Sequence, residues 1–315
     1  MRVVVAGGAG QLGRVIVRAL RADGNEVTVL SRRSASSTDT IWWDGRTLGP
    51  WADALDGADV LINLAGRSVS CRYTKHNLRE MLDSRVESTR VLGQAIARVC
   101  RPPAVWLQAS TATIYAHTYG PPHDEASGVI GGGEPDVPRY WQTSVDIALA
   151  WERELYAAEA PATRKVALRT GFVMTNEPDG AFLLLAKLAR WGLGGPIAGG
   201  EQFVSWIHQD DFVSALRFLI DRSDISGVVN VVSPTPLPHA DLMAGLRQVV
   251  GTCFGIPASR ALMEVAAWVH RTDSELILKS RRVAPARLSE AGFQFAFPVW
   301  AAAARDLLDQ GRRAA

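Results

Sequence analysis

The first thirteen residues constrain the fold more than any other part of the chain. Residues 3–6 are an unbroken apolar run, the pattern of a strand buried on both faces of a parallel sheet. Gly7, Gly10 and Gly13 follow, each three residues after the last, and helical spacing of apolar residues begins at Leu12. In this order a strand, a glycine turn and a helix bind a dinucleotide, because the glycines allow a tight turn, close backbone approach to a pyrophosphate and close helix packing. The amino end of the helix then offers N–H groups to the phosphates.

The residues after the second expected strand, 26–30, indicate which dinucleotide binds. Enzymes that use NAD usually carry an acidic residue here, which binds the ribose 2′-hydroxyl. This chain has Ser31, Arg32 and Arg33 instead. A carboxylate would repel a 2′-phosphate, whereas a hydroxyl and a guanidinium bind one, so we expect NADP(H) rather than NAD(H). The alternative is that the two arginines only solvate a loop.

Composition limits the class of protein. A chain of 315 residues can form one large α/β domain, or such a domain with a smaller lobe. The net charge of +2 gives no reason to expect a nucleic acid or a membrane surface as partner. Cys71, Cys100 and Cys253 are far apart and lack metal-binding spacing, so we expect reduced thiols. Because Met1 leads directly into the first strand and no apolar run could cross a bilayer, we expect a soluble cytoplasmic protein.

Strand and helix patterns alternate through the first half of the chain. Short apolar runs at residues 41–43, 59–66 and 104–109 read as strands, and residues 77–99 have the spacing of a long helix. The run 59–66 ends in small residues, as needed where backbone passes beside a cofactor. The alternation predicts a Rossmann-type α/β fold, a doubly wound parallel sheet, with a smaller C-terminal substrate lobe.

Three motifs resemble the extended short-chain dehydrogenase/reductase superfamily: residues 7–13, 63–66 and 110–115. Later motifs narrow the resemblance to its atypical epimerase-like branch, whose members are often mislabelled as SulA-type cell-division inhibitors; these motifs are residues 192–197, 206–211, 230–234, 281–288 and 291–293. The resemblance spans almost the whole chain. It implies NADP(H) binding, an unassigned substrate and a small C-terminal domain of unassigned role.

The glycine turn and the resemblance together predict the residues that contact the cofactor. They come from the carboxyl ends of the expected strands and from the long helix, and they are Gly7, Gly10, Gln11, Leu12, Gly13, Ser31, Arg32, Leu64, Ala65, Gly66, Glu80, Arg85, Ala109, Thr170 and Gly171. One departure from the family is Arg67, which stands where many relatives have glutamate. The chemistry of the pocket is therefore expected to differ at this position.

The superfamily usually carries a Tyr-x-x-x-Lys pair for proton transfer, and the chain lacks one, as the resemblance to the atypical branch implies. In our alignment Gln142 and Asp146 occupy the two positions. Thr111 matches the Ser/Thr that hydrogen-bonds the reacting oxygen, and Tyr115 is the best remaining hydroxyl for proton transfer. Asp146 could act as an acid if it is buried near the ribose, because burial raises the pKa of a carboxyl group. The alternative for Asp146 is an ordinary exposed position on a helix.

We expect the Rossmann domain to span residues 1–233, with an insertion at about 181–207 that belongs to the substrate lobe. Residues 234–315 would then form the small C-terminal substrate or lid domain. A long loop at about 116–138 is either an active-site lid or a surface loop, since its length fits both.

The motif around residue 208 predicts part of the substrate pocket. We expect Trp206 and His208 to line this pocket and Asp210 to cap the next helix. Direct acid–base catalysis by His208 is the alternative. His117 and His123 have no recognisable ligand spacing, so we expect no metal.

These observations leave two hypotheses of different classes. The first is an NADP(H)-dependent oxidoreductase or epimerase that acts on a small polar carbonyl or alcohol, or on a sugar-nucleotide-like substrate. The second is a non-catalytic NADP(H)-binding redox sensor, which the missing Tyr-x-x-x-Lys pair favours. The substrate-lobe motifs favour the enzyme, because a sensor needs no such lobe. By analogy with extended relatives, two long helices beside the sheet could form a homodimer.

Overall fold

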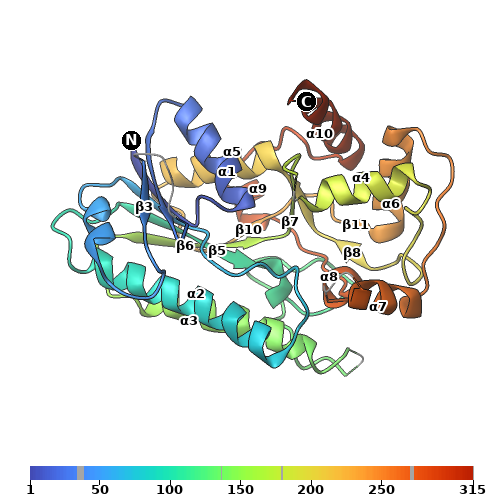
Figure 1. Ribbon diagram of the computed structural model, residues 1–315, viewed down its shortest axis with the longest axis horizontal. Coiled ribbons are helices and arrows are strands. Elements are labelled where there is room, and N and C mark those ends of the chain that lie inside the picture. Colours follow the sequence, from blue (N-terminus) through green and yellow to red (C-terminus); the bar gives the residue numbers. More distant parts are fainter. Residues whose placement is uncertain (34–38, 136, 179, 270–272, 315) are drawn as a thin grey trace.

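The computed structural model describes residues 1–33, 39–135, 137–178, 180–269 and 273–314 (Figure 1). Its centre is a seven-stranded sheet in the order β10-β6-β5-β4-β1-β2-β3, and every neighbouring pair is parallel. The strands are β1 (Arg2–Ala6), β2 (Glu26–Ser31), β3 (Thr40–Trp42), β4 (Val60–Asn63), β5 (Val105–Thr111), β6 (Arg164–Thr170) and β10 (Gly227–Val231). The order reverses direction beside β1, so the predicted doubly wound α/β fold is confirmed.

Helices cover both faces of this sheet. On one face lie α1 (Gln11–Ala22), α5 (Gln209–Asp221) and α9 (Ala286–Glu290), and on the other lie α2 (Lys75–Ile96) and α3 (Trp141–Ala157) (Figure 1). Two short 3₁₀ turns, η1 (Pro50–Leu55) and η2 (Ala112–Ile114), complete this part of the chain.

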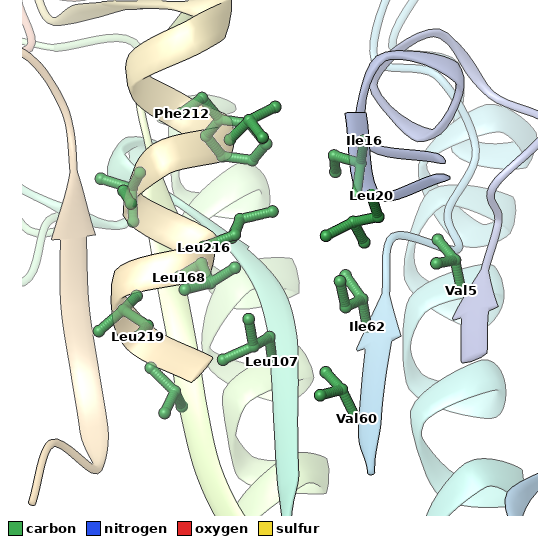
Figure 2. Packing of buried hydrophobic residues seen from close by; sticks show 14 of the residues in the cluster. Val5, Ile16, Leu20, Val60, Ile62, Leu107, Leu168, Phe212, Leu216 and Leu219 are labelled. Atoms are coloured by element: carbon green, nitrogen blue, oxygen red, sulfur yellow. The ribbon is translucent and has the colours of Figure 1, made fainter. Parts of the chain in front are cut away.

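Successive side chains of a strand point to opposite faces of the sheet, so the buried side chains form one cluster on each face. Along β1, Val3 and Val5 pack with α1 and α5, whereas Val4 packs in the cluster that includes α2. Figure 2 shows the first cluster, in which Ile16 of α1 and Phe212 of α5 point toward the strands. Burying each such side chain stabilises the fold by about 1.5–3 kcal/mol, so this sheet holds its carboxyl edge in a fixed position.

A second, smaller core lies beyond the carboxyl edge of the sheet. It is built from α4 (Ala181–Arg190), α6 (His239–Val250), α10 (Trp300–Ala314) and the short strands β7 (Phe172–Met174), β8 (Phe203–Val204), β9 (Trp206–His208) and β11 (Leu237–Pro238). The helices α7 (Arg260–Val269) and α8 (Glu275–Leu278) lie between α6 and α9 in the chain. Within the expected C-terminal domain, Leu288 and Phe293 pack in the core of the large sheet, and the boundary at residue 233 stays a prediction.

No helix in the described part of the chain is long and apolar enough to cross a membrane. Cys71, Cys100 and Cys253 are free thiols, in agreement with the expectation from their spacing. The long loop after η2 contacts the C-terminal part of the chain, because His123 forms an isolated bridge with Val283.

Candidate functional site

The glycine turn after β1 packs against its neighbours more closely than any residue with a Cβ would allow. Gly7 has φ +78°, a conformation that favours glycine, and a Cβ added there would lie 2.9 Å from the Ala65 nitrogen. A Cβ on Gly13 would lie 2.5 Å from the Cα of Gly8, so only glycine lets α1 approach the turn this closely. Gly10 precedes α1 and makes no side-chain cap, which leaves the first N–H groups of the helix for a phosphate.

The end of β2 lies beside this turn, because the Gly7 N–H donates to the Leu30 carbonyl at 2.9 Å. Ser31 is buried, and its Oγ accepts the Arg33 N–H at 3.1 Å. The Arg32 and Arg33 side chains are exposed. A hydroxyl and two cations therefore stand at the position where the adenosine ribose of a bound dinucleotide would need them.

The end of β4 forms the opposite wall. The Asn63 amide donates to the Gln108 side chain at 3.0 Å, and its Oδ1 accepts the Ala65 N–H at 3.0 Å. These bonds hold Leu64 and Ala65 next to the glycine turn. Gly66 follows, and a Cβ there would meet the Arg85 guanidinium carbon at 3.3 Å.

The long helix α2 brings Arg85 and Glu80 toward this wall in different ways. The Arg85 guanidinium lies 5.0 Å from the Trp151 ring centroid, and burial lowers the pKa of Arg85 to about 10, so it stays charged at neutral pH. The Glu80 carboxylate pairs with the Arg67 guanidinium and lies 3.4 Å from His76. Arg67, the residue that departs from the family pattern, is therefore the partner of Glu80. Whether either residue contacts a cofactor stays a prediction.

The candidate catalytic threonine stands at the end of β5. Thr111 is half-buried, and its Oγ accepts the Thr113 N–H at 3.1 Å, which starts the η2 turn. Strand register aligns Ala109 with Leu168 and Thr111 with Thr170. Thr170 and the following Gly171, which were predicted to contact the cofactor, therefore lie at the same edge of the sheet as Thr111.

The position of Tyr115 does not fit the role expected for it. Its side chain is only 1% exposed, its hydroxyl donates to Asn230 Oδ1 at 2.9 Å, and it accepts the Arg169 Nη1–H at 3.0 Å. Burial raises the pKa of Tyr115. Both functions of the hydroxyl are used inside the core, so we correct the prediction of proton transfer to a structural role.

Tyr115 belongs to a buried polar network that sequence reasoning missed. The Arg169 guanidinium binds both carboxylate oxygens of Glu152, at 2.8 and 2.7 Å, and the Ser110 hydroxyl donates to the same carboxylate at 2.6 Å. The local signal for it was Arg169, a charged residue directly after the buried apolar run 166–168 of β6. Its partners are 17 and 42 residues away from Glu152 in the chain.

Asp146 also lies elsewhere than a proton donor requires. It is exposed on α3, where it accepts a hydrogen bond from the Gln142 amide at 2.8 Å. The predicted acid role depended on burial near the ribose, and this burial is absent. Asp146 has the exposed position of an ordinary helical aspartate, and we withdraw it as a catalytic residue.

Trp206 and His208 are fully buried in the smaller core. The Trp206 indole donates to the Thr235 carbonyl at 3.0 Å, and the His208 ring packs on Phe297 at 4.0 Å between centroids. The prediction that both side chains line a substrate pocket is therefore wrong for this arrangement. The helix cap is also corrected, because Nδ1 of His208, rather than the Asp210 carboxylate, accepts the Asp210 N–H at 3.1 Å.

His208, Asp210 and Asp306 bring one ligand atom each within 4.8 Å of one another. The cap uses the lone pair of His208 Nδ1, so the ring proton belongs on Nε2, which lies 3.3 Å from the Asp306 carboxylate. A ring in this tautomer has no lone pair left for a metal. The contact of His208 with Asp306 instead joins the start of α5 to α10, where the Gln310 amide also donates to the Asp210 carboxylate at 2.9 Å.

Two basic side chains reach the Thr111 turn from the C-terminal part of the chain, and sequence reasoning did not single them out as site residues. Lys279 and Arg281 both contact Thr113. Burial lowers the pKa of Lys279 to about 8. The candidate site thus combines a dinucleotide-shaped turn, a threonine at the end of β5 and buried cations from the second lobe.

Comparisons with known proteins agree with this arrangement. Residues 3–138 match the NAD dependent epimerase/dehydratase family, and residues 265–307 match a domain of unknown function, DUF1731. The epimerase family protein SDR39U1 of Bos taurus is 32% identical, over 98% of this chain and 100% of its own length. YfhF of Bacillus subtilis, also an epimerase family protein, is 29% identical over 94% of each chain.

Solved structures extend the comparison to three dimensions. Human SDR39U1, crystallised with NADPH, has a TM-score of 0.86 at 29% identity, covering 98% of this chain and 99% of that one. A UDP-N-acetylglucosamine 4-epimerase of Bacillus cereus has a TM-score of 0.74 at 17% identity, covering 98% and 99%, which shows a shared fold alone. With a relative above 30% identity along nearly its whole length, the chain belongs to the SDR39U1-type epimerase family, an atypical extended branch of the short-chain dehydrogenases/reductases.

Proposed function

We propose that the protein is an NADP(H)-binding oxidoreductase or epimerase that acts on a small polar carbonyl or alcohol, or on a sugar-nucleotide-like substrate. The observation that carries the proposal is the glycine turn beside Ser31 and Arg32. Gly7 and Gly13 lie so close to the backbone of Ala65 and Gly8 that no Cβ fits, which is the tight turn and close helix packing that a pyrophosphate-binding loop needs. The NADPH in the human relative supports the same cofactor here.

The chain's own residues would bind the cofactor and orient the substrate. The N–H groups at the start of α1 bind the pyrophosphate, and Arg32 with Ser31 binds the 2′-phosphate. The bound nucleotide supplies or accepts a hydride. Thr111 accepts the Thr113 N–H, and among the described residues no acceptor uses its own hydroxyl proton. This proton is the one that Thr111 would donate to the reacting oxygen of the substrate.

Cofactor choice can be tested before any substrate is known. Titration followed by nicotinamide fluorescence should show NADPH binding much more tightly than NADH. Arg32→Glu should weaken NADPH binding by about 10- to 100-fold, the loss of a charge-assisted contact of about 1.5–3 kcal/mol. Arg153→Glu, on the exposed surface of α3, is the matched control and should leave the affinity unchanged. Equal affinity of the wild type for NADH and NADPH would contradict the proposal.

Turnover separates the enzyme from the redox sensor. NADPH oxidation is followed by absorbance across a panel of aldehydes, ketones and nucleoside-diphosphate sugars. Turnover that is lost in Thr111→Val supports the enzyme, because the hydroxyl is removed while the shape is kept. Cofactor binding without turnover of any compound would favour the sensor. A cytoplasmic location and a homodimer through α2 and α3 stay predictions.

A further inference from the structure

The second lobe reaches the Thr111 turn through one short segment, residues 275–283, which we call the brace. It begins as α8 and continues as extended chain. The Arg281 N–H donates to the Phe203 carbonyl at 2.8 Å, and the His123 N–H donates to the Arg282 carbonyl at 2.8 Å. The brace therefore lies between β8 of the smaller lobe and the loop that follows η2.

Two side chains of the brace hold Thr113. The Lys279 ammonium donates to the Thr113 carbonyl at 2.9 Å, and Nε of Arg281 donates to the Thr113 hydroxyl at 3.1 Å. The Thr113 N–H in turn donates to Oγ of Thr111 at 3.1 Å. Thr113 is thus fixed at its carbonyl, its side chain and its N–H, and the last of these bonds orients the Thr111 hydroxyl.

Both cations are placed at an energetic cost. Lys279 is 2% exposed and Arg281 is 5% exposed, and burial lowers the pKa of each. The Lys279 ammonium lies 3.9 Å from the Glu275 carboxylate, whose other oxygen accepts the Ser144 hydroxyl proton at 2.6 Å. A buried ion pair often contributes little to stability, since desolvation offsets the attraction between the charges. Stability alone therefore does not explain why these charges stand here.

The charged groups around Lys279 come from three elements. Glu275 faces it from α8, and Arg281 faces it from the extended part of the brace. Glu134 and His117 face it from the loop after η2, where burial, and then the charge on Lys279, lowers the pKa of His117. The ammonium therefore lies at the contact between the two lobes.

We propose that Lys279 and Arg281 are positioning residues, which hold the η2 turn so that the Thr111 hydroxyl faces the reacting oxygen of the substrate. This inference deepens the proposed function and rests on it for the role of Thr111. It gives a task to the part of the chain that matches the domain of unknown function: residues 265–307 include the brace and complete the catalytic edge of the large sheet.

The test uses the full-length protein with NADPH and 4-nitrobenzaldehyde as carbonyl probe. Lys279→Met removes the ammonium and keeps an unbranched apolar side chain. We expect kcat to fall by about 10²-fold, the usual effect of misplacing a catalytic group, while the Kd for NADPH stays unchanged. Lys279→Arg keeps a cation and should restore much of the loss. The matched control is Arg282→Met, since the neighbouring Arg282 donates to the Gly120 carbonyl at 2.7 Å rather than to Thr113.

A double-mutant cycle separates positioning from general structural support. If Lys279 acts through Thr111, then Lys279→Met should cause no further loss of kcat in the Thr111→Val background. Losses that multiply in the double variant would overturn the proposal. Should Lys279→Met not fold, Thr113→Val tests the second contact of the brace, because it removes the hydroxyl that accepts the Arg281 Nε–H and keeps the shape.

Hydrogen exchange provides a readout that needs no substrate. The amides of residues 111–115 should exchange faster in Lys279→Met and in Arg281→Met, but not in Arg282→Met. Unchanged protection of this segment in both brace variants would refute the inference whatever the kinetics show. If the wild type turns over no substrate while these amides respond as expected, the proposed function fails and the brace remains supported as the device that orders the turn.

Discussion

Because of Lys279, the free energy of unfolding should rise with pH while kcat falls. Burial lowers its pKa from the ordinary value of 10.5 to about 8. Between these two values the unfolded chain binds a proton that the folded protein lacks, so the free energy of unfolding rises with pH across this window. The difference corresponds to about 3 kcal/mol, at about 1.4 kcal/mol for each pH unit. Over the same window the folded protein loses the ammonium that holds the Thr113 carbonyl.

Urea unfolding of the wild type and of Lys279→Met, measured from about pH 7 to about pH 10.5, compares two proteins that differ in this one titrating group. The free energy of unfolding of the wild type, minus that of the variant, should increase by about 3 kcal/mol. In the same range kcat of the wild type should fall, and kcat of Lys279→Arg should not, since an arginine stays protonated.

Two results would refute this reasoning. A stability difference that does not change with pH would mean that Lys279 keeps an ordinary pKa and that burial has not disfavoured its charge. A wild-type kcat that stays constant from about pH 8 to about pH 10 would mean that the turn does not need the ammonium. If kcat stays constant, the contact between Lys279 and Thr113 would contribute to packing between the lobes and not to catalysis.

Three other substitutions test the fold around the site. Arg169→Met should cost about 3–5 kcal/mol in urea unfolding, because it leaves the Glu152 carboxylate buried without its cation, and the double variant with Glu152→Met should recover most of this loss. Gly13→Ala should cost about 1–3 kcal/mol and weaken NADPH binding in a fluorescence titration, since its Cβ would lie 2.5 Å from the Gly8 Cα; unchanged values would contradict the close packing. Asp211→Asn should lower thermal stability by about 1–2 kcal/mol, because the carboxylate accepts two backbone N–H groups of the segment before α10.

The strand and helix order was predictable because it depends on local patterns. The apolar run of β1, the glycines and the helical spacing of α1 lie within about twenty residues of one another, so no distant contact is needed to recognise them. The helix expected at residues 77–99 is α2, Lys75–Ile96. The predicted start was two residues too late. Thr74 caps the helix by accepting the Asn77 N–H at 3.2 Å, and a threonine at this position is a cap signal that the sequence contains.

Side-chain roles that depend on packing between distant segments were not predictable. His208 was expected in a pocket because of the motif around it, yet α10, carrying Asp306, covers it. Tyr115 was expected to face a substrate, yet Arg169 and Asn230, which are 54 and 115 residues away, hold its hydroxyl in the core. A polar residue near a strand end can serve the site or the core, and only its partners decide which.

The positions of Tyr115 and Asp146 also limit how fast the proposed enzyme can be. The Tyr115 hydroxyl is bonded inside the core, and Asp146 lacks the burial on which its predicted role depended, so neither provides the general acid that was expected. Loss of a positioned general acid costs about 10²–10⁴-fold in rate, so we expect slow turnover that depends on the Thr111 hydroxyl and on a proton from water. The measurement is kcat with a panel substrate across pH. A wild-type kcat typical of ordinary short-chain reductases would mean that another side chain donates the proton, and its pKa would be visible in the pH profile.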